Sequence, residues 1–247
     1  MAALLWPSLG ALLGLVAGSF LATLVIRWPE GKPLSGRSRC DSCGAAVGWA
    51  DLVPLLGWLA LKGRCRACGA AIDARHPLFE LTAAAIGLLA MLAVPGPQGL
   101  WGALLGWTLL ALLALDLAHY WLPDRLTLPL LALGLAGGPG LLTDRLLGAA
   151  IGGGGLLLLA LLYRWLRGRE GLGLGDVKLM AALGAWLSPA YLGPLLLAAS
   201  VAGLAFAALS RWRGAGEEGA PIRVPFGACL ALAGFPMWLI ANAAGGV

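Results

Sequence analysis

Charged residues are scarce in this chain of 247 residues. Aspartate, glutamate, lysine and arginine together make up 12% of it, whereas about a quarter of a soluble domain is charged. Hydrophobic residues make up 60%, and the mean hydropathy is +0.87. The lack of charge excludes an ordinary soluble domain and predicts a protein that crosses a membrane several times.

Apolar stretches near the roughly 20 residues needed to cross a bilayer recur along the chain. About eight can be read, of which the sixth is short, so the predicted fold class is all-α: a multi-span transmembrane helical bundle with a small hydrophilic loop domain. We expect a first span at residues 1–27, a cytoplasmic loop at 28–76 and a membrane core at 77–247. The expected spans are residues 4–26, 77–95, 98–115, 125–141, 144–163, 177–188, 190–209 and 222–243.

The first span lacks the features of a removed signal peptide. No charged residue precedes it and no small-residue cleavage site follows it, so we interpret it as a retained helix. Within it Gly10, Gly14 and Gly18 recur at every fourth position, and Gly148 and Gly152 repeat this spacing in the fifth span. Such spacing favours close helix packing, although it is weak evidence in a chain with 38 glycines.

The basic residues predict the orientation. With eight spans, four hydrophilic segments fall on one side of the membrane, and with Arg27 they hold 16 of the 17 lysines and arginines, leaving Arg145 opposite. The positive-inside rule places these segments in the cytoplasm and both termini outside. Topology thus explains the net charge of +5 without a nucleic-acid partner, and membrane lipid headgroups are a compatible partner. The segments are residues 28–76, 116–125, 164–178 and 210–223.

Two aspartates stand at the ends of apolar runs. Asp116 ends the third run, and Asp176 follows the glycine-rich residues 171–175 before the sixth. Carboxylates are costly beside a bilayer and usually functional. Both are predicted at the cytoplasmic side, where a pair sharing one proton would suit an aspartyl protease. Asp176 is equally explained as a helix cap, whereas Asp116 lies at the C-terminal end of its helix, where the dipole opposes a negative charge.

Four of the five cysteines lie in the hydrophilic loop as two Cys-x-x-Cys pairs, Cys40 with Cys43 and Cys65 with Cys68, with 21 residues between the pairs. This pattern predicts a closed, structural zinc site. The alternative is a pair of disulfides, which a reducing cytoplasm disfavours. Cys229, in the last span, is interpreted as a small hydrophobic residue.

An ordered set of motifs runs through nearly the whole chain. It comprises Gly18-Ser19-Phe20-Leu21, Arg27, Pro29, the cysteine pairs with their flanking arginines, Trp49, Asp51, Pro54-Leu55, Trp58-Leu59, Arg75, Pro77, Glu80, Asp116 with Pro123-Asp124, Gly173-Leu174-Gly175-Asp176-Val177-Lys178 and Pro225-Phe226-Gly227. In this order and spacing the set resembles the type IV prepilin leader peptidases of type IV pilus and type II secretion systems, a family of Gly-x-Gly-Asp aspartyl membrane proteases.

The resemblance implies a two-step enzyme of the bacterial inner membrane. Asp116 and Asp176 would cut the basic leader from prepilins or pseudopilins after a glycine, at the cytoplasmic face. Many family members then methylate the new N-terminus with S-adenosylmethionine. The chain contains no glycine-rich nucleotide fingerprint after a predicted strand, so this cofactor rests on the resemblance alone and its binding residues stay unassigned, as does the oligomeric state.

Two positions depart from the family pattern, and three other functions stay open. Ala22 stands where the family usually has asparagine, and His76 where it usually has tyrosine. The alternatives are a peptidase with a purely structural zinc loop, a non-enzymatic zinc-bearing scaffold of a secretion system, and a proton-coupled transporter. Asp124, at the head of the fourth predicted span, is interpreted as a helix N-cap in preference to a catalyst.

Overall fold

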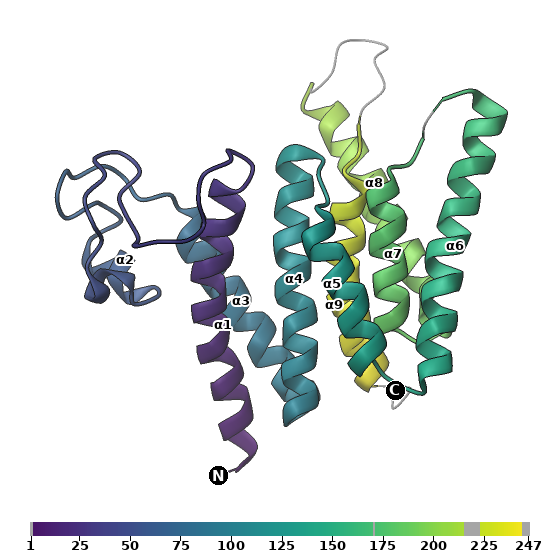
Figure 1. Cartoon of the computed structure of the whole chain (residues 1–247), viewed down its shortest axis with the longest axis horizontal. Helices are drawn as coiled ribbons and strands as arrows, with labels where there is room; N and C mark the ends of the chain where they lie inside the picture. The colour runs from purple at the N-terminus through teal and green to yellow at the C-terminus, as the bar shows by residue number, and fades with distance from the viewer. Residues whose placement is uncertain (1, 170, 215–222, 244–247) are drawn as a thin grey trace. The chain divides into compact units, whose positions relative to one another are not determined.

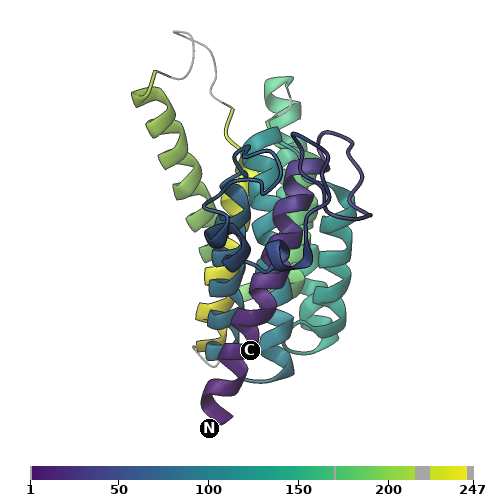
Figure 2. The ribbon, with the colours of Figure 1, turned by 90° about the vertical axis from the view of Figure 1, so that its left-hand side faces the viewer.

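The computed structural model describes residues 2–169, 171–214 and 223–243. Over these residues the regular structure is helical, and the only β-pairing is two isolated bridges in the cysteine loop (Figures 1 and 2). The predicted all-α class is therefore confirmed. The elements are α1 (Ala2–Arg27), η1 (Trp49–Leu52), α2 (Leu56–Ala60), α3 (Arg75–Ala93), α4 (Pro97–His119), α5 (Asp124–Gly137), α6 (Leu142–Arg167), α7 (Leu174–Trp186), η2 (Pro189–Tyr191), α8 (Leu192–Trp212) and α9 (Phe226–Ala243).

Each predicted span corresponds to one α-helix, but the helices differ in length. In the described part of the chain, six helices are long and apolar enough to cross a membrane. The other two are α5, with 14 residues, and α7, with 13. Helix α5 ends at Gly137, four residues before the predicted end, because Gly138-Pro139-Gly140 breaks it. Residue 222, the predicted start of the last span, lies outside the described residues.

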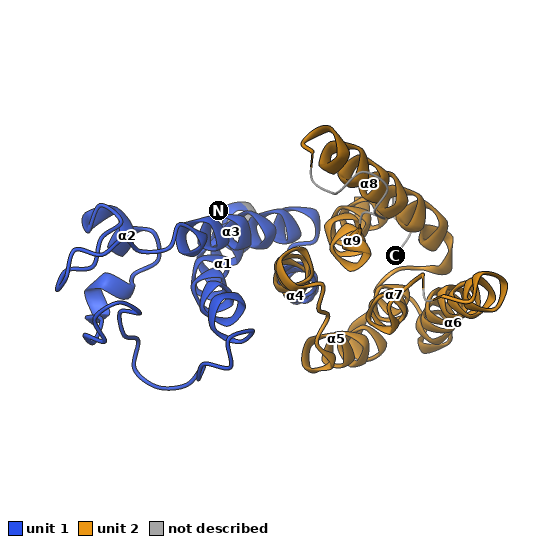
Figure 3. Cartoon of the chain, turned by 90° about the horizontal axis from the view of Figure 1, so that it is seen from above, with its two compact units in different colours: residues 1–107 blue, residues 108–247 orange. Residues whose placement is uncertain are grey.

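The chain divides into two compact units, residues 1–107 and 108–247 (Figure 3). In the first, α1 and α3 run antiparallel, with Gly10 beside Gly87, Gly14 beside Ala83 and Gly18 beside Phe79. A Cβ at any of these three α1 glycines would overlap the backbone of α3. The spacing of four residues therefore does mark a close helix contact.

In the second unit, α7 packs against α5, α6 and α9. The Trp186 indole donates a hydrogen bond of 2.8 Å to the Leu130 carbonyl of α5. Gly148 of α6 and Gly184 of α7 bring the two backbones into contact, where a Cβ on either glycine would overlap the other residue's carbonyl. Although α7 is short, it is held on several sides, and its first turn carries Asp176.

Candidate active site and metal centre

Asp116 lies in the last turn of α4 and is buried, with 5% of its surface exposed. Its Oδ2 accepts a hydrogen bond of 2.7 Å from the backbone N–H of Ala228. Ala228 is the third residue of α9, so this N–H is one of the donors that a helix N-terminus leaves without an intrahelical partner. The N-terminus of α9 thus compensates a carboxylate that its own helix dipole disfavours.

Asp176 is also buried, with 9% exposure, in the first turn of α7. Its Oδ2 accepts a hydrogen bond of 3.3 Å from the N–H of Gly173, the residue that precedes the helix. This is the carboxylate half of a capping box. The carboxylate therefore caps its helix, and its second oxygen points elsewhere.

The two carboxylates meet beside Gly227, near the start of α9. A Cβ placed on Gly227 would lie 2.9 Å from Asp176 Oδ1 and 3.1 Å from Asp116 Oδ2. The two oxygens can be no farther apart than the sum of these distances, about 6 Å. One water molecule can accept and donate hydrogen bonds across such a separation. The structure thus brings together the two aspartates that the sequence could only place on one membrane side.

The cysteine pairs form two copies of one tight turn. In the first, Gly44 N–H donates to the Cys40 carbonyl and Cys40 N–H to the Ala45 carbonyl, each at 2.9 Å. In the second, Gly69 and Cys65 make the corresponding bonds at 2.8 Å. Both glycines adopt positive φ, 71° and 73°, which glycine reaches without strain.

These turns bring four thiols to one point. All four Sγ atoms, of Cys40, Cys43, Cys65 and Cys68, lie within 4.8 Å of one another, and Cys40 and Cys68 are 3.9 Å apart. Thiolates about 2.3 Å from a tetrahedral zinc lie about 3.8 Å apart, whereas disulfide sulfurs are about 2.0 Å apart. Backbone amides of Cys43 and Ser42 lower the pKa of the Cys40 thiol to about 6. The site can hold a metal ion, and its geometry is compatible with zinc.

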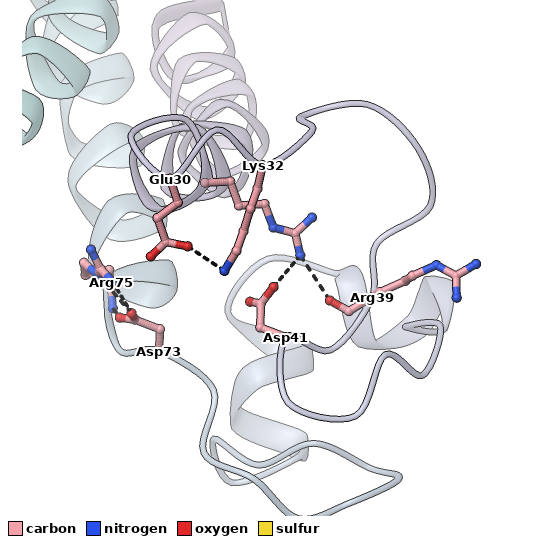
Figure 4. Close-up of polar contacts among 7 residues, drawn as sticks. Glu30, Lys32, Arg39, Asp41, Asp73 and Arg75 are labelled. Atoms are coloured by element: carbon pink, nitrogen blue, oxygen red, sulfur yellow. Dashed lines mark hydrogen bonds and ion pairs between the residues drawn. The ribbon is translucent and has the colours of Figure 1, made fainter.

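Ion pairs tie the cysteine loop to its surroundings. Arg27, the last residue of α1, donates hydrogen bonds to Asp41 Oδ1 at 2.9 Å and to the Arg39 carbonyl at 3.1 Å. Figure 4 labels the two acceptor residues and marks both bonds with dashed lines. Arg66, in the second turn, donates to both carboxylate oxygens of Asp51 in η1, at 2.6 and 3.1 Å. The loop is thereby attached to the end of α1 and to its own short helices.

Known proteins match both parts of the chain. The family model described as "Bacterial Peptidase A24 N-terminal domain" matches residues 12–94, and that described as "Type IV leader peptidase family" matches residues 103–208. A Burkholderia pseudomallei (strain 1026b) protein named "Prepilin leader peptidase/N-methyltransferase" is 40% identical over 254 residues, covering 90% of this chain and 81% of the relative. The chain belongs to the type IV leader peptidase family.

Other relatives agree with this membership. The Aeromonas salmonicida (strain A449) protein of the same name is 44% identical over 204 residues, which is 81% of this chain and 69% of that protein. In Escherichia coli O78:H11 (strain H10407 / ETEC), the "Type 4 prepilin-like proteins leader peptide-processing enzyme" is 36% identical over 259 residues, 92% and 91% of the two chains. No solved structure matches. As a member of this family with six candidate spans in its described part, the chain is a multi-pass protein of the bacterial inner membrane.

Both aspartates of this leader peptidase homologue fall within the matched residues, whereas Gly227 and Ala228 lie beyond them. From the sequence, Pro225-Phe226-Gly227 was only a block that matched the family pattern, and neither Gly227 nor Ala228 had a predicted role. A proline and a glycine at the start of an apolar run were the available signal, because they mark a helix N-terminus with exposed N–H donors.

The expected N-cap role of Asp124 is wrong. Asp124 is the first residue of α5, the N-cap is Pro123, and no side chain caps the helix. Instead, its two carboxylate oxygens accept hydrogen bonds from Lys178 Nζ, at 2.7 and 2.9 Å. Lys178 follows Asp176 by two residues, so this pair links the start of α5 to the turn of α7 that carries the carboxylate.

Replacing Lys178 with methionine is expected to lower kcat by about two- to fivefold with little change in KM, because an exposed ion pair contributes up to about 1 kcal/mol. The pair is partly exposed, with 40% and 54% of the two side chains accessible. The measurement is the steady-state rate of leader cleavage. The reversed pair Lys178→Asp with Asp124→Lys should recover most of the loss, and equal activity of the single and reversed variants would contradict a positioning role.

Proposed function

We propose that this protein cuts the leader peptide from type IV prepilins or prepilin-like proteins and then methylates the new N-terminus. The names of its relatives support both activities. The observation that carries the peptidase proposal is the convergence of two buried carboxylates beside Gly227. A scaffold would not need two carboxylates kept in this costly arrangement.

The proposed cleavage uses Asp116 and Asp176 as a general acid–base pair. Two adjacent buried carboxylates repel each other as anions, so the pair is expected to share one proton. The ionised member takes a proton from a water molecule held between them, and the water attacks the scissile carbonyl. The protonated member donates to the carbonyl oxygen or to the leaving amine.

Backbone hydrogen bonds keep both carboxylates in position for this step. The Ala228 amide holds Asp116 Oδ2, and the Gly173 amide holds Asp176 Oδ2. One Asp176 oxygen, Oδ1, remains directed toward Gly227. Since both donors belong to the backbone at helix starts, they keep the carboxylates oriented without a change in side-chain conformation.

The proposed site faces the cytoplasm. The four segments that, together with Arg27, hold 16 of the 17 basic residues contain Asp116, Asp176 and the whole cysteine loop. The positive-inside rule supports this orientation. It also supports a reducing environment for the four cysteines, in which they bind zinc as thiolates.

Zinc, held by Cys40, Cys43, Cys65 and Cys68, is proposed to be structural, since four thiolates leave no open coordination position. S-adenosylmethionine would supply the methyl group to the N-terminal amine that cleavage exposes. The residues that bind it are not assigned. The names of the relatives support the methylating function.

The test is to incubate the purified full chain in detergent or nanodiscs with a prepilin precursor and S-adenosylmethionine, and to analyse products by mass spectrometry. Loss of the leader with a gain of one methyl group supports both activities. Leader loss without the methyl group leaves a peptidase with a structural zinc loop. Intact precursor, with an active relative as positive control, contradicts the proposal and favours the scaffold or transporter alternatives.

Gly227→Ala is expected to reduce cleavage by about 10²-fold, comparable to misplacing a catalytic group by roughly 1 Å. Its added Cβ would lie about 3 Å from one oxygen of each aspartate and would overlap Leu122. The measurement is kcat on a prepilin precursor. Gly193→Ala is the matched control, because a Cβ there meets nothing within 4 Å. Wild-type activity of Gly227→Ala would show that the space between the carboxylates is not used.

A further inference from the structure

The short helices of the cysteine loop expose large apolar side chains. Trp49 in η1 is 85% exposed, and Leu56 and Leu59 in α2 are 65% and 60% exposed. The two helices pack on each other through Gly57, where a Cβ would overlap the Asp51 carbonyl. One side of this pair therefore makes the contact between the helices, while Trp49, Leu56 and Leu59 remain outside it.

A partly buried hydrogen bond fixes the position of α2 along the membrane-spanning helix α3. The N–H of Leu55, which precedes α2, donates to Glu80 Oε2 at 2.7 Å. Glu80 is 5% exposed and is the sixth residue of α3, about 8 Å along the helix axis from its start. Leu55 has φ of 60°, an unusual value for a residue with a side chain. The contact thus holds the loop in a conformation that it would otherwise avoid.

Helix α2 consequently lies beside the α1 and α3 pair and not beyond its end. Figures 1 and 2 show it level with the upper part of α1 in both views. In the first two turns of α3, Leu78 and Leu81 lie on either side of Glu80 in the sequence and are 60% and 56% exposed. Such side chains on a membrane-spanning helix face lipid. The bond to Glu80 therefore holds α2 beside a stretch of α3 that itself carries lipid-facing side chains.

The charges around this surface match an anionic bilayer. Lys62 and Arg64 follow α2 directly and are exposed. Arg66 is exposed as well, but its charge is paired with Asp51. An amphipathic segment with apolar and aromatic side chains on one part and basic side chains beside it is typical of helices that lie in the interface of a membrane. Tryptophan in particular is enriched at this depth.

We propose that η1 and α2 form an interfacial membrane anchor, in which Trp49, Leu56 and Leu59 insert at the headgroup–acyl boundary of the inner membrane and the following basic residues contact anionic lipid headgroups. The contact keeps the cysteine loop on the bilayer surface. It is independent of catalysis, and its test uses a readout other than activity.

The test replaces single positions with the photo-crosslinker p-benzoylphenylalanine in the full chain, in nanodiscs that contain phosphatidylglycerol. Leu56 and Leu59 are probed in separate variants, so that misfolding of one does not decide the result. Ser42 is the matched control, because it is exposed in the same loop and follows Asp41, which is bound to the end of α1. Zinc content is measured in every variant to confirm that the loop is folded.

Lipid adducts at positions 56 and 59 are expected to exceed those at position 42 by about tenfold, since only an inserted side chain remains close to acyl chains. Three results would overturn the proposal: crosslinks to residues 108–247 of the same chain, crosslinks to a second copy, or lipid labelling no higher than at position 42. Nanodiscs of purely zwitterionic lipid distinguish the two components of the contact. Labelling should fall by several-fold there if the basic residues contribute.

Discussion

Asp116→Asn and Asp176→Asn are each expected to lower the rate of leader cleavage by about 10²- to 10⁴-fold, the usual contribution of general acid–base catalysis. Asparagine keeps the size of the side chain and an oxygen that can accept the hydrogen bonds from Ala228 or Gly173. It cannot take up or release the shared proton. The measurement is kcat/KM on a purified prepilin precursor.

The matched control for this prediction is Asp144→Asn. Asp144 is the third residue of α6, and its Oδ2 accepts a backbone hydrogen bond of 3.1 Å from Leu141, the same capping contact that Asp176 makes with Gly173. Loss of a cap costs about 1 kcal/mol of stability, so Asp144→Asn reports the effect of capping without the chemistry. If an Asp116 or Asp176 variant retains the activity of this control, the proposed pair is wrong.

Loss of the metal is expected to unfold the cysteine loop. Structural zinc contributes about 10–16 kcal/mol of apparent binding free energy in small metal-dependent folds, and a loop of this size has little hydrophobic core to replace it. Cys40→Ser or Cys65→Ser should therefore reduce bound zinc from about one per chain to almost none. The loop should then be cut rapidly by trypsin, which is measured by limited proteolysis and mass spectrometry.

Cys229→Ala is the control for the zinc measurement. Cys229 is buried in α9 and belongs to the second unit, whereas the four clustered cysteines belong to the first. This variant should bind as much zinc as the unmodified protein. A Cys40→Ser protein that keeps full zinc content and protease resistance would contradict the four-thiolate site. Disulfides and metal binding are distinguished by treating the protein with a reductant or a chelator. A loop held by a metal should remain protease-resistant in reductant and become protease-sensitive in chelator.

Much of the fold could be predicted because crossing a bilayer constrains both the composition and the secondary structure of a chain. A chain with 12% charged residues must satisfy its backbone inside lipid, and helices do so within a single segment. The exact lengths of the helices were harder to predict from the sequence. Helix α5 is shorter than its apolar run because Gly137 to Gly140 with Pro139 stop it, and α7 is only 13 residues long. The glycine repeats of α1 and α6 mattered more than their frequency suggested, since they meet backbone on the facing helices.

The sequence alone singled out the groups proposed to act in the protein: Asp116 and Asp176 as costly carboxylates, and four cysteines whose spacing permits a single metal site. Only the tertiary structure decided that the carboxylates converge beside Gly227, that Ala228 supports Asp116, and that Asp124 binds Lys178. The reason is physical. Residue types and local spacing act within one helix or turn, whereas these contacts join segments more than 50 residues apart and depend on how helices pack.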